Sequence, residues 1–375
     1  MGVAHRHRDG AQEPMPSIVD PARTLKIQPL SWPRIATPPL IAAVLRALPE
    51  DFVVEEQLPF ILTGAGEHLW LKVRKRGLNT EQVAKQLARL AGVTRREVGY
   101  AGMKDRHAVA VQWFSLYLPG RADPDWGTLP DGLTIIEATR HTRKLKTGAL
   151  SGNRFEIVLR DCHGDRDAVL QRSTEINARG VPNYFGEQRF GHGGANVAEA
   201  RALFAGEGKR CDRKQTGIYL SAARSYLFNE VLAQRVLAGT WDEVMDGDAM
   251  ILNGTRSFFV PAAVDDTIRR RLAEGDIHTS GPLWGRGELP TRAATRALEQ
   301  TIADEHPELA RGLERAGLDQ ERRALRVIPQ DLQTEWLDDT SLQLRFGLPA
   351  GTYATALLRE LAVYTTASHL KDEHE

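Results

Sequence analysis

The sequence predicts a mixed α/β protein with two domains, and three observations support this. The chain has 375 residues, of which 42% are hydrophobic, enough for more than one small core. Segments with the two-residue period of a strand are interspersed with segments of helical period. From about Asn183 the sequence turns glycine-rich and then strongly helical, which indicates a second domain.

Residues 1–40 are expected to form an extended or disordered leader, so ordered chain should begin near Ile41. Seven of the 19 prolines fall there: Pro14, Pro16, Pro21, Pro29, Pro33, Pro38 and Pro39. A proline-rich, weakly apolar segment cannot bury enough surface to fold alone. The first residues also lack the apolar stretch of a secretory signal.

Strand and helix patterns follow one another up to about residue 180. At 69–74, Leu69, Leu71 and Val73 alternate with polar or aromatic residues, which predicts a strand. Helices are expected from Thr80, read as the N-cap, to about Gly92, and over 165–179 before Gly180. Further strands are expected at 111–118 and 153–160.

The second half is expected to be mainly helical before strands return. Helices are predicted over 225–237 and, as one or two elements, over 290–316. Strands follow at 325–329 and 341–348, and a last helix runs from Gly351 to about Ser368. Strands separated by a helical region suggest one domain inserted into another.

Charge and cysteine usage narrow the functional class only partly. The chain carries 49 Lys+Arg and 49 Asp+Glu, a net charge of zero. Residues 46–160 hold 18 basic against 13 acidic residues, a net of +5, and residues 301–375 hold 8 against 14, a net of −6. This predicts either a basic face for nucleic acid or a random scatter of charge.

Several classes of protein are disfavoured. Two cysteines, Cys162 and Cys211, make no disulfide framework and fit a reduced, cytoplasmic protein. No stretch approaches the roughly 20 apolar residues that span a bilayer. The sequence has no Walker A motif, dinucleotide fingerprint, HExxH or G-x-S-x-G. Metal, nucleotide-cofactor and serine-hydrolase functions are therefore weakly supported.

The strongest candidate for chemistry is Asp105, in the segment GYAGMKDRHAVAVQ at 99–112. A polar turn at the start of a strand can present a side chain over the sheet edge. Cationic neighbours, Lys104 and Arg106, favour an ionised carboxylate that can act as a nucleophile. The alternative is that Asp105 only caps a turn.

A second candidate region is RHTRKLKTGALSGNRF at 140–155. It holds five Lys or Arg residues and ends in Asn153, Arg154 and Phe155. Cations for phosphates, an amide for a base edge and a ring for stacking could together hold an extruded nucleotide. The alternative is a solvated basic turn before an ordinary core strand.

A third region, NYFGEQRFG at 183–191, has aromatic residues between Glu187, Gln188 and Arg189. It could be a loop that faces nucleic acid or the hinge where one domain leaves the other.

Seven segments in order resemble the tRNA pseudouridine synthases of the TruD family. They are PEDFVVEE (49–56), GEHLWLKVRKRGLNT (66–80), GYAGMKDRHAVAVQW (99–113), SGNRF (151–155), NYFGEQRFG (183–191), DGDA (246–249) and LPAGTYATALLREL (348–361). The resemblance implies a pseudouridine-synthase catalytic domain with a mixed, largely antiparallel sheet over 41–185 and 324–375. It also implies an inserted, mainly helical α/β domain over 186–323.

The resemblance further implies roles for individual residues. Asp105 matches the catalytic aspartate, and substrate-binding residues would be Phe52, Asn153, Phe155, Tyr353 and Arg46. Tyr353 stands where relatives often have Phe, and Arg46 where they often have Lys. The basic residues expected to hold the RNA are Arg74, Lys75, Arg76, Lys104, Arg140, Arg143, Lys144, Lys146 and Arg189.

The implied activity is isomerisation of uridine to pseudouridine at position 13 of tRNA, in the D-arm, typically of the glutamate tRNA. The resemblance implies no cofactor and no metal, a tRNA partner and no membrane, and we expect a cytoplasmic monomer. Two other readings stay open: a non-catalytic RNA-binding protein with the same fold, and a different aspartate-dependent enzyme such as a hydrolase.

Overall fold

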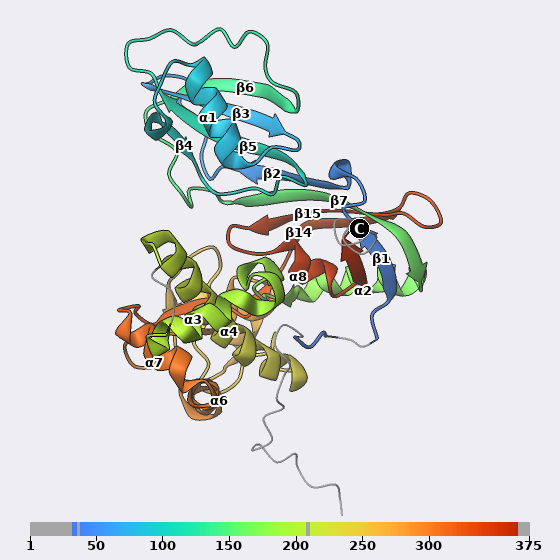
Figure 1. Ribbon diagram of the computed structural model, residues 1–375. Coiled ribbons are helices and arrows are strands. Elements are labelled where there is room, and N and C mark those ends of the chain that lie inside the picture. Colours follow the sequence, from blue (N-terminus) through green and yellow to red (C-terminus); the bar gives the residue numbers. More distant parts are fainter. Residues whose placement is uncertain (1–31, 36–37, 208–210, 367–375) are drawn as a thin grey trace, which may run out of the picture.

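The protein consists of a large sheet with helices against it and a second, mainly helical part below it (Figure 1). The computed structural model describes residues 32–35, 38–207 and 211–366. The mixed α/β class expected from the sequence is confirmed. No helix in these ranges is long and apolar enough to cross a membrane.

A ten-stranded sheet forms the scaffold of the first part. Its main order is β14-β15-β7-β2-β5-β3-β6, with β1, β16 and β4 paired at its margins. Pairs β2–β5 and β1–β16 are parallel, and the other described pairs are antiparallel. The strands are β1 Ile41–Leu45, β2 Phe52–Gln57, β3 His68–Lys75, β4 Val98–Tyr100, β5 Val109–Tyr117, β6 Leu133–His141, β7 Gly152–Gly164, β14 Gln330–Trp336, β15 Leu342–Pro349 and β16 Ala362–Thr366.

Three helices belong to this sheet: α1 (Thr80–Leu90), α2 (Arg166–Arg179) and α8 (Ala354–Leu358). The apolar stripe of α1 packs on β3 and β5 in one core cluster. Residues of α2 and α8 share a second cluster with β7 and β15. Short 3-10 helices, η1 (Pro49–Asp51) and η2 (Arg95–Glu97), precede β2 and β4.

The second part holds a core of its own, in which the long helix α4 is central. Its small sheet has the order β10-β9-β11-β12. Its elements are η3 Glu187–Arg189, η4 His192–Gly194, α3 Ala195–Ala205, α4 Arg213–Leu237, β9 Met250–Leu252, β10 Phe258–Phe259, α5 Asp266–Ala273, β11 Ile277–Leu283, α6 Ala293–Glu305, α7 Pro307–Arg315 and β12 Glu321–Ala324.

Two short strands carry the chain from the large sheet into the second part and back. Strand β8 (Val181–Pro182) leads out and β13 (Arg326–Val327) leads back, and the two pair with each other in antiparallel register. The segment between them folds beside the large sheet without interrupting it. We keep 186–323 as the proposed extent of the inserted domain.

Helix ends show how local sequence sets the elements. The helix expected over 165–179 is confirmed: Asp165 accepts a hydrogen bond from the Ala168 amide at 2.9 Å, and Gly180 ends the helix with a φ of +79°. The N-cap of α1 is Asn79, not Thr80 as expected, and it accepts from the Gln82 amide. Thr80 is thereby left to bond the turn that carries Asp105.

Two expectations near the C-terminus are wrong. The helix expected from Gly351 to about Ser368 is only α8, after which Ala362–Thr366 forms strand β16. This strand pairs in parallel with β1, more than 300 positions away in sequence. The strand expected at 325–329 is two residues long, and the longer β14 follows it. Helix α4 also begins earlier than the expected 225, at Arg213.

Ordered chain does not first begin near Ile41, as the proline content suggested. Trp32 is 7% exposed and packs among Tyr184, Phe190 and Tyr226 of the second part. The Ile35 amide donates to Glu360, 2.9 Å away. Trp32 to Ile35 therefore lie across both parts, and the leader residues before 32 are outside the described ranges.

Candidate active site

Asp105 lies in the turn between β4 and β5, where its carboxylate is partly exposed. Oδ2 is 2.9 Å from Nη1 of Arg46, and the side chain is 24% exposed. Oδ1 accepts a hydrogen bond from the His107 amide at 3.0 Å. Two donors leave further lone pairs of the carboxylate open. Asp105 is therefore held in place but still able to contact a substrate.

The backbone of this turn is held from the interior by Lys75. The Lys75 ammonium donates to the carbonyls of Leu78 at 2.8 Å, Asp105 at 2.9 Å and Lys104 at 3.4 Å. The residue is fully buried, and burial lowers the pKa of its ammonium to about 8, against the opposing influence of Asp105. The expectation that Lys75 binds RNA phosphates is wrong, because phosphate cannot reach it.

Two further buried side chains fix the same turn. Thr80 accepts from the Lys104 amide at 2.9 Å and donates to Gln112, which itself donates to the Gly102 carbonyl at 2.7 Å. Thr80 and Gln112 are fully buried. The main chain on the N-terminal side of Asp105 is thus hydrogen-bonded to both α1 and β5.

Lys104 pairs with Glu56 of β2, and this also corrects its expected role. Its ammonium is 2.7 Å from Oε1, while Oε2 accepts from the Trp113 amide at 2.8 Å. Burial raises the pKa of Glu56, and the Lys104 charge opposes that rise. With 12% of its side chain exposed, Lys104 serves the turn rather than the RNA surface.

Arg46 occupies an unusual backbone conformation beside Asp105. Its φ is +60°, in the left-handed region that non-glycine residues rarely adopt. The guanidinium lies 4.3 Å from the centre of the Phe52 ring while it pairs with Asp105. Because β2 and β5 run in parallel from the same end, Phe52 at the start of β2 lies beside the turn.

The aromatic residues expected at the substrate site are mostly packed inside. Phe52 and Phe155 are 6% and 8% exposed and meet edge to face at 6.1 Å, and Phe155 stacks on Phe346 at 5.3 Å. Asn153 lies two residues before Phe155 on β7, and its buried Oδ1 has no hydrogen-bond partner among the described residues. An unpaired buried acceptor is costly unless a ligand or water fills it.

Tyr353 lies apart from these rings, at the junction with the inserted part. Its hydroxyl accepts from Arg189 Nε at 3.0 Å and Nη2 at 2.7 Å, and Arg189 also donates to Ser221 at 2.9 Å. Phe185 contacts the Tyr353 ring edge to face at 6.0 Å. The region 183–191 therefore joins the two parts through its side chains.

The remaining basic residues differ in how far they are free to bind RNA. Arg76 is 58% exposed but pairs with Glu50, and Arg140 pairs with Asp123 and donates to two carbonyls. Lys144 donates to the Arg96 carbonyl at 2.5 Å. Arg74, Arg143 and Lys146 are exposed, as are Arg76 and Lys144.

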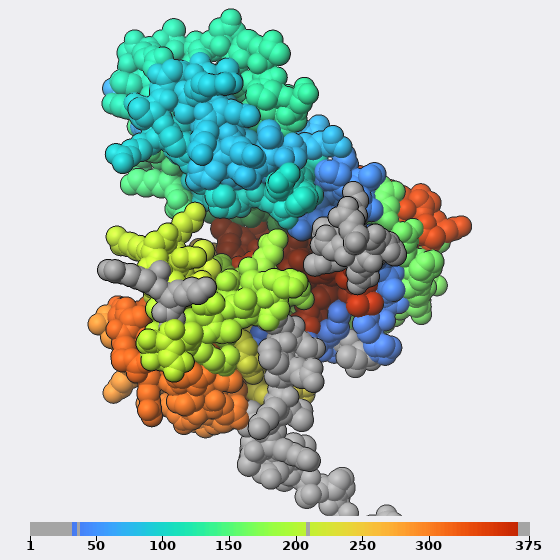
Figure 2. Space-filling model, viewed as in Figure 1, coloured from blue at the N-terminus to red at the C-terminus, as the bar shows by residue number. Residues whose placement is uncertain are grey.

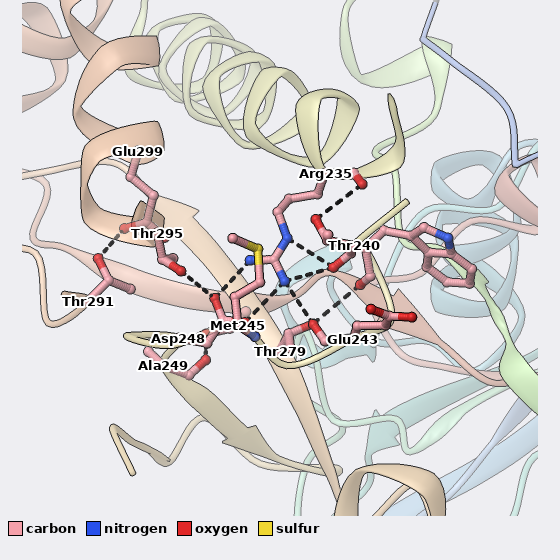
Figure 3. Close-up of polar contacts among 12 residues, drawn as sticks. Arg235, Thr240, Glu243, Met245, Asp248, Ala249, Thr279, Thr291, Thr295 and Glu299 are labelled. Atoms are coloured by element: carbon pink, nitrogen blue, oxygen red, sulfur yellow. Dashed lines mark hydrogen bonds and ion pairs between the residues drawn. The ribbon is translucent and has the colours of Figure 1, made fainter. Parts of the chain in front are cut away.

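The second acidic motif, DGDA at 246–249, is structural. Asp248 is fully buried and receives four donors: Arg235 Nη1 at 2.8 Å and Nη2 at 3.0 Å, Thr295 at 2.8 Å and the Met245 amide at 2.8 Å (Figure 3). A Cβ at Gly247 would lie 2.2 Å from the Arg292 carbonyl oxygen. The motif therefore makes its contacts inside the inserted part and stabilises its fold.

Open space lies between the two parts. Figure 2 shows a hollow between the cyan upper part and the green segment below it, with dark red C-terminal residues at its floor. A separate cavity of about 310 Å³ is lined by Glu55, Lys72, Trp113 and neighbours. Because side chains alternate along a strand, it lies on the sheet face opposite Phe52 and Gln112, and it does not belong to this site.

Sequence reasoning missed Glu56, Thr80 and Gln112 as supports of the turn, and Arg323 at the junction. A signal for Glu56 was present, because it follows Phe52 and Val54 at the two-residue period of the buried face. The other contacts depend on the positions of α1 and β12, which no local pattern determines.

Comparisons with known proteins agree on one family. The model of the family described as tRNA pseudouridine synthase D (TruD) matches residues 34–207 and 196–361. The tRNA pseudouridine synthase D of Hydrogenovibrio crunogenus is 50% identical over 320 residues, which is 85% of this chain and 92% of that protein. The protein of the same name from Methylococcus capsulatus is 51% identical over 321 residues, 85% of this chain and 91% of the relative.

A crystal structure assigned as tRNA pseudouridine synthase D from Methanosarcina mazei has the same fold. It aligns with a TM-score of 0.66 over 88% of this chain and 95% of that chain, at 20% sequence identity. The match confirms the fold that the motifs implied.

Proposed function

The chain belongs to the tRNA pseudouridine synthase D (TruD) family, as its motifs predicted, and we propose that it isomerises uridine in tRNA to pseudouridine. Family membership and about 50% identity over most of the chain support the activity. In the reaction, the N1–C1′ bond of uridine breaks, the base turns and a C5–C1′ bond forms. C5 loses a proton and N1 gains one, so no atom is gained or lost overall.

Asp105 is the proposed nucleophile. The observation that supports this proposal is the geometry of Asp105. Its carboxylate is partly exposed, Arg46 lies 2.9 Å from it, and only two donors among the described residues bond it. A covalent bond from one carboxylate to the target nucleotide divides a difficult rearrangement into easier steps. Arg46 orients the carboxylate.

The target base must leave its stack in the folded RNA, which costs a few kcal/mol. Stacking on an aromatic side chain returns about 1–3 kcal/mol per base. Tyr353 is the partly exposed ring among the three expected ones, so we assign it the stacking role, with Phe52 and Phe155 as the packed base of the site. The unpaired Oδ1 of Asn153 is an acceptor suited to the imino N–H of uracil.

The proposed substrate position is uridine 13 in the D-arm, and the proposed RNA surface contains Arg74, Arg143 and Lys146 with Arg76, Arg140, Lys144 and Arg189. Phosphate contacts from these side chains would position the tRNA without reading its sequence. We further propose that the enzyme acts as a monomer, because one chain supplies Asp105, Arg46 and Asn153. We also propose that it acts in the cytoplasm.

The experiment that tests this function is nucleoside mapping. Purified protein is incubated with unmodified tRNA transcripts, and pseudouridine is located by chemical derivatisation and primer extension. We expect one modified uridine, at position 13, in the glutamate tRNA. A transcript in which only uridine 13 is replaced by cytidine is the matched control. Absence of pseudouridine from every transcript would reject the activity, and modification elsewhere would reject the position.

A further inference from the structure

Arg323, in β12, reaches across the junction between the two parts of the protein. Its Nη1 donates to the Gly351 carbonyl at 2.9 Å, and its Nη2 donates to Asn183 Oδ1 at 2.7 Å. The guanidinium carbon lies 4.1 Å from the centre of the Phe185 ring. The guanidinium is thus held on three sides by groups from two segments, 183–191 and the turn at Gly351.

Arg189 approaches the same aromatic ring. Its guanidinium carbon is 5.6 Å from the Phe185 centre, while its nitrogens bond the hydroxyls of Tyr353 and Ser221. Two guanidinium groups therefore share one ring, next to the tyrosine to which we assign the target base.

Neither guanidinium has a charged partner among the described residues. Every acceptor bonded to them is neutral: two backbone carbonyls and one amide oxygen for Arg323, and two hydroxyls for Arg189. Several other partly or fully buried arginines do have carboxylates, as in the pairs Arg235–Asp248, Arg322–Glu299 and Arg224–Glu321. A partly buried charge without a counter-charge is costly, so the pair is suited to receive an anion.

The electrostatics of Arg323 agree with this. Burial, together with the nearby charge of Arg189, lowers the pKa of its guanidinium to about 10. Tyr353 opposes this lowering. An anion placed between the two arginines would attract both guanidiniums and so offset the repulsion between them.

The pair is open to a ligand on the side of Gly351. Gly351 is exposed, and the Arg323 Nη1 that bonds its carbonyl lies at the surface. Tyr353, which Arg189 holds, is itself partly exposed. A ligand that contacts Tyr353 can therefore place a neighbouring charged group against both guanidiniums.

We propose that Arg189 and Arg323 together bind one backbone phosphate of the tRNA, beside the nucleotide that is isomerised. The inference rests on the proposed function, because the phosphate comes from the RNA substrate. Guanidinium groups present paired donors that match phosphate oxygens. The site would fix the backbone of the extruded nucleotide while Tyr353 stacks on its base.

The test measures the coupling between each arginine and each phosphate. Binding is measured with the Asp105→Asn protein, using RNA hairpins that each carry one neutral methylphosphonate linkage. One linkage next to the target uridine should weaken binding about tenfold, the loss of one charge-assisted contact. In Arg323→Met and Arg189→Met proteins the same linkage should have little further effect, and the slope of log K against log salt should fall by about 0.7–0.9.

The control is Arg345→Met, on the open face of the sheet, where Arg345 lies 3.6 Å from Glu156 and 3.8 Å from Glu335. It should leave both the methylphosphonate penalties and the salt slope unchanged. If Arg323→Met does not fold, the same measurements are made with Arg189→Met and Arg323→Lys. The lysine keeps the charge but loses the paired donors.

The outcomes separate this inference from the proposed function. If the wild-type protein converts uridine in the hairpin but each linkage has the same effect in parent and arginine variants, the phosphate site is wrong and the activity stands. If inorganic phosphate binds in an Arg323-dependent way but no linkage is coupled, the site takes a free anion and the assignment to RNA is overturned. If the wild-type protein forms no pseudouridine, the proposed function fails, whatever the binding shows.

Discussion

Two aspartate–arginine pairs in this protein each contain an aspartate from a family motif, but the surroundings of the two carboxylates differ. Asp105 is 24% exposed, and its two described donors are Arg46 and the His107 amide. Asp248 is fully buried and receives four donors from three residues. One carboxylate keeps open lone pairs toward solvent, and the other has its bonding capacity filled.

This difference separates an aspartate that stabilises the fold from one that is able to react. A saturated, buried carboxylate cannot attack a substrate, but its removal leaves an uncompensated buried cation. An accessible carboxylate with few donors contributes little to stability and is free to react. In the Asp105 turn the stabilising bonds are instead made by the backbone, through Lys75, Thr80 and Gln112.

The largest expected difference is in catalysis. Asp105→Asn should lower the rate of pseudouridine formation by at least about 10⁴-fold, because the amide is a poor nucleophile. The midpoint of thermal unfolding and the Kd for tRNA should stay near those of the wild type. Single-turnover kinetics and filter binding measure the two effects. A variant that keeps more than a few per cent of the wild-type rate would mean that Asp105 is not the nucleophile.

The reverse pattern is expected for Asp248→Asn. Removing one partner of a fully buried ion pair costs about 3–5 kcal/mol of unfolding free energy, measurable by urea denaturation. The fraction that remains folded should form pseudouridine at close to the wild-type rate. A stable Asp248→Asn protein with a large loss of kcat would reverse the comparison.

A smaller effect is expected from the buried lysine behind Asp105. Lys75→Met leaves buried carbonyls without a donor, at about 1–3 kcal/mol each, and should lower kcat about 10- to 100-fold as the turn loosens. Lys72→Met, at a lysine that pairs with Glu55 on the open sheet face, is the matched control and should change kcat little.

The pH dependence of kcat tests the role of Lys75. With its pKa near 8, the wild-type ammonium loses a proton above that pH and has two hydrogens for three carbonyls, so kcat should fall above about pH 8. The charged neighbours that face it are Asp105 and Glu56, which favour the ammonium, and Lys104, which disfavours it.

The stability change should have the opposite sign. The folded-state pKa lies below the ordinary lysine value of 10.5, so between pH 8 and 10.5 the unfolded chain binds more protons. The contribution of Lys75 to the unfolding free energy therefore rises with pH in that window. A wild-type kcat that stays constant to pH 9.5, or one that falls equally in Lys75→Met, would contradict the assignment.

Sequence patterns predicted what is local. The two-residue period located β3 and β7, a run of apolar and aromatic residues located β5, and Asp165 and Gly180 bounded α2. Strands and caps depend on neighbouring residues. Strand β16 was mistaken for helix because its partner, β1, is distant in sequence. Val363, Thr365 and Thr366 are β-branched, which was a local sign of a strand.

The candidate site divides in the same way. Asp105, Arg46 and Phe52 could be named from motifs, and the structure brings them into contact. Lys75 and Lys104 were read as phosphate ligands because charge suggests exposure, whereas both reach inward to carbonyls and to Glu56. The Arg189–Arg323 pair depends on the packing of two parts of the chain, and no local pattern contains it.

The measurement that tests the central claim most directly is detection of the covalent bond to Asp105. An RNA with 5-fluorouridine at the target position should stall after this bond forms, because fluorine at C5 cannot leave as the proton does. The account predicts a protein–RNA adduct in intact-mass spectra, with the modified peptide containing Asp105, and no adduct with Asp105→Asn. An adduct on any other side chain, or its formation by the Asn variant, would contradict the account.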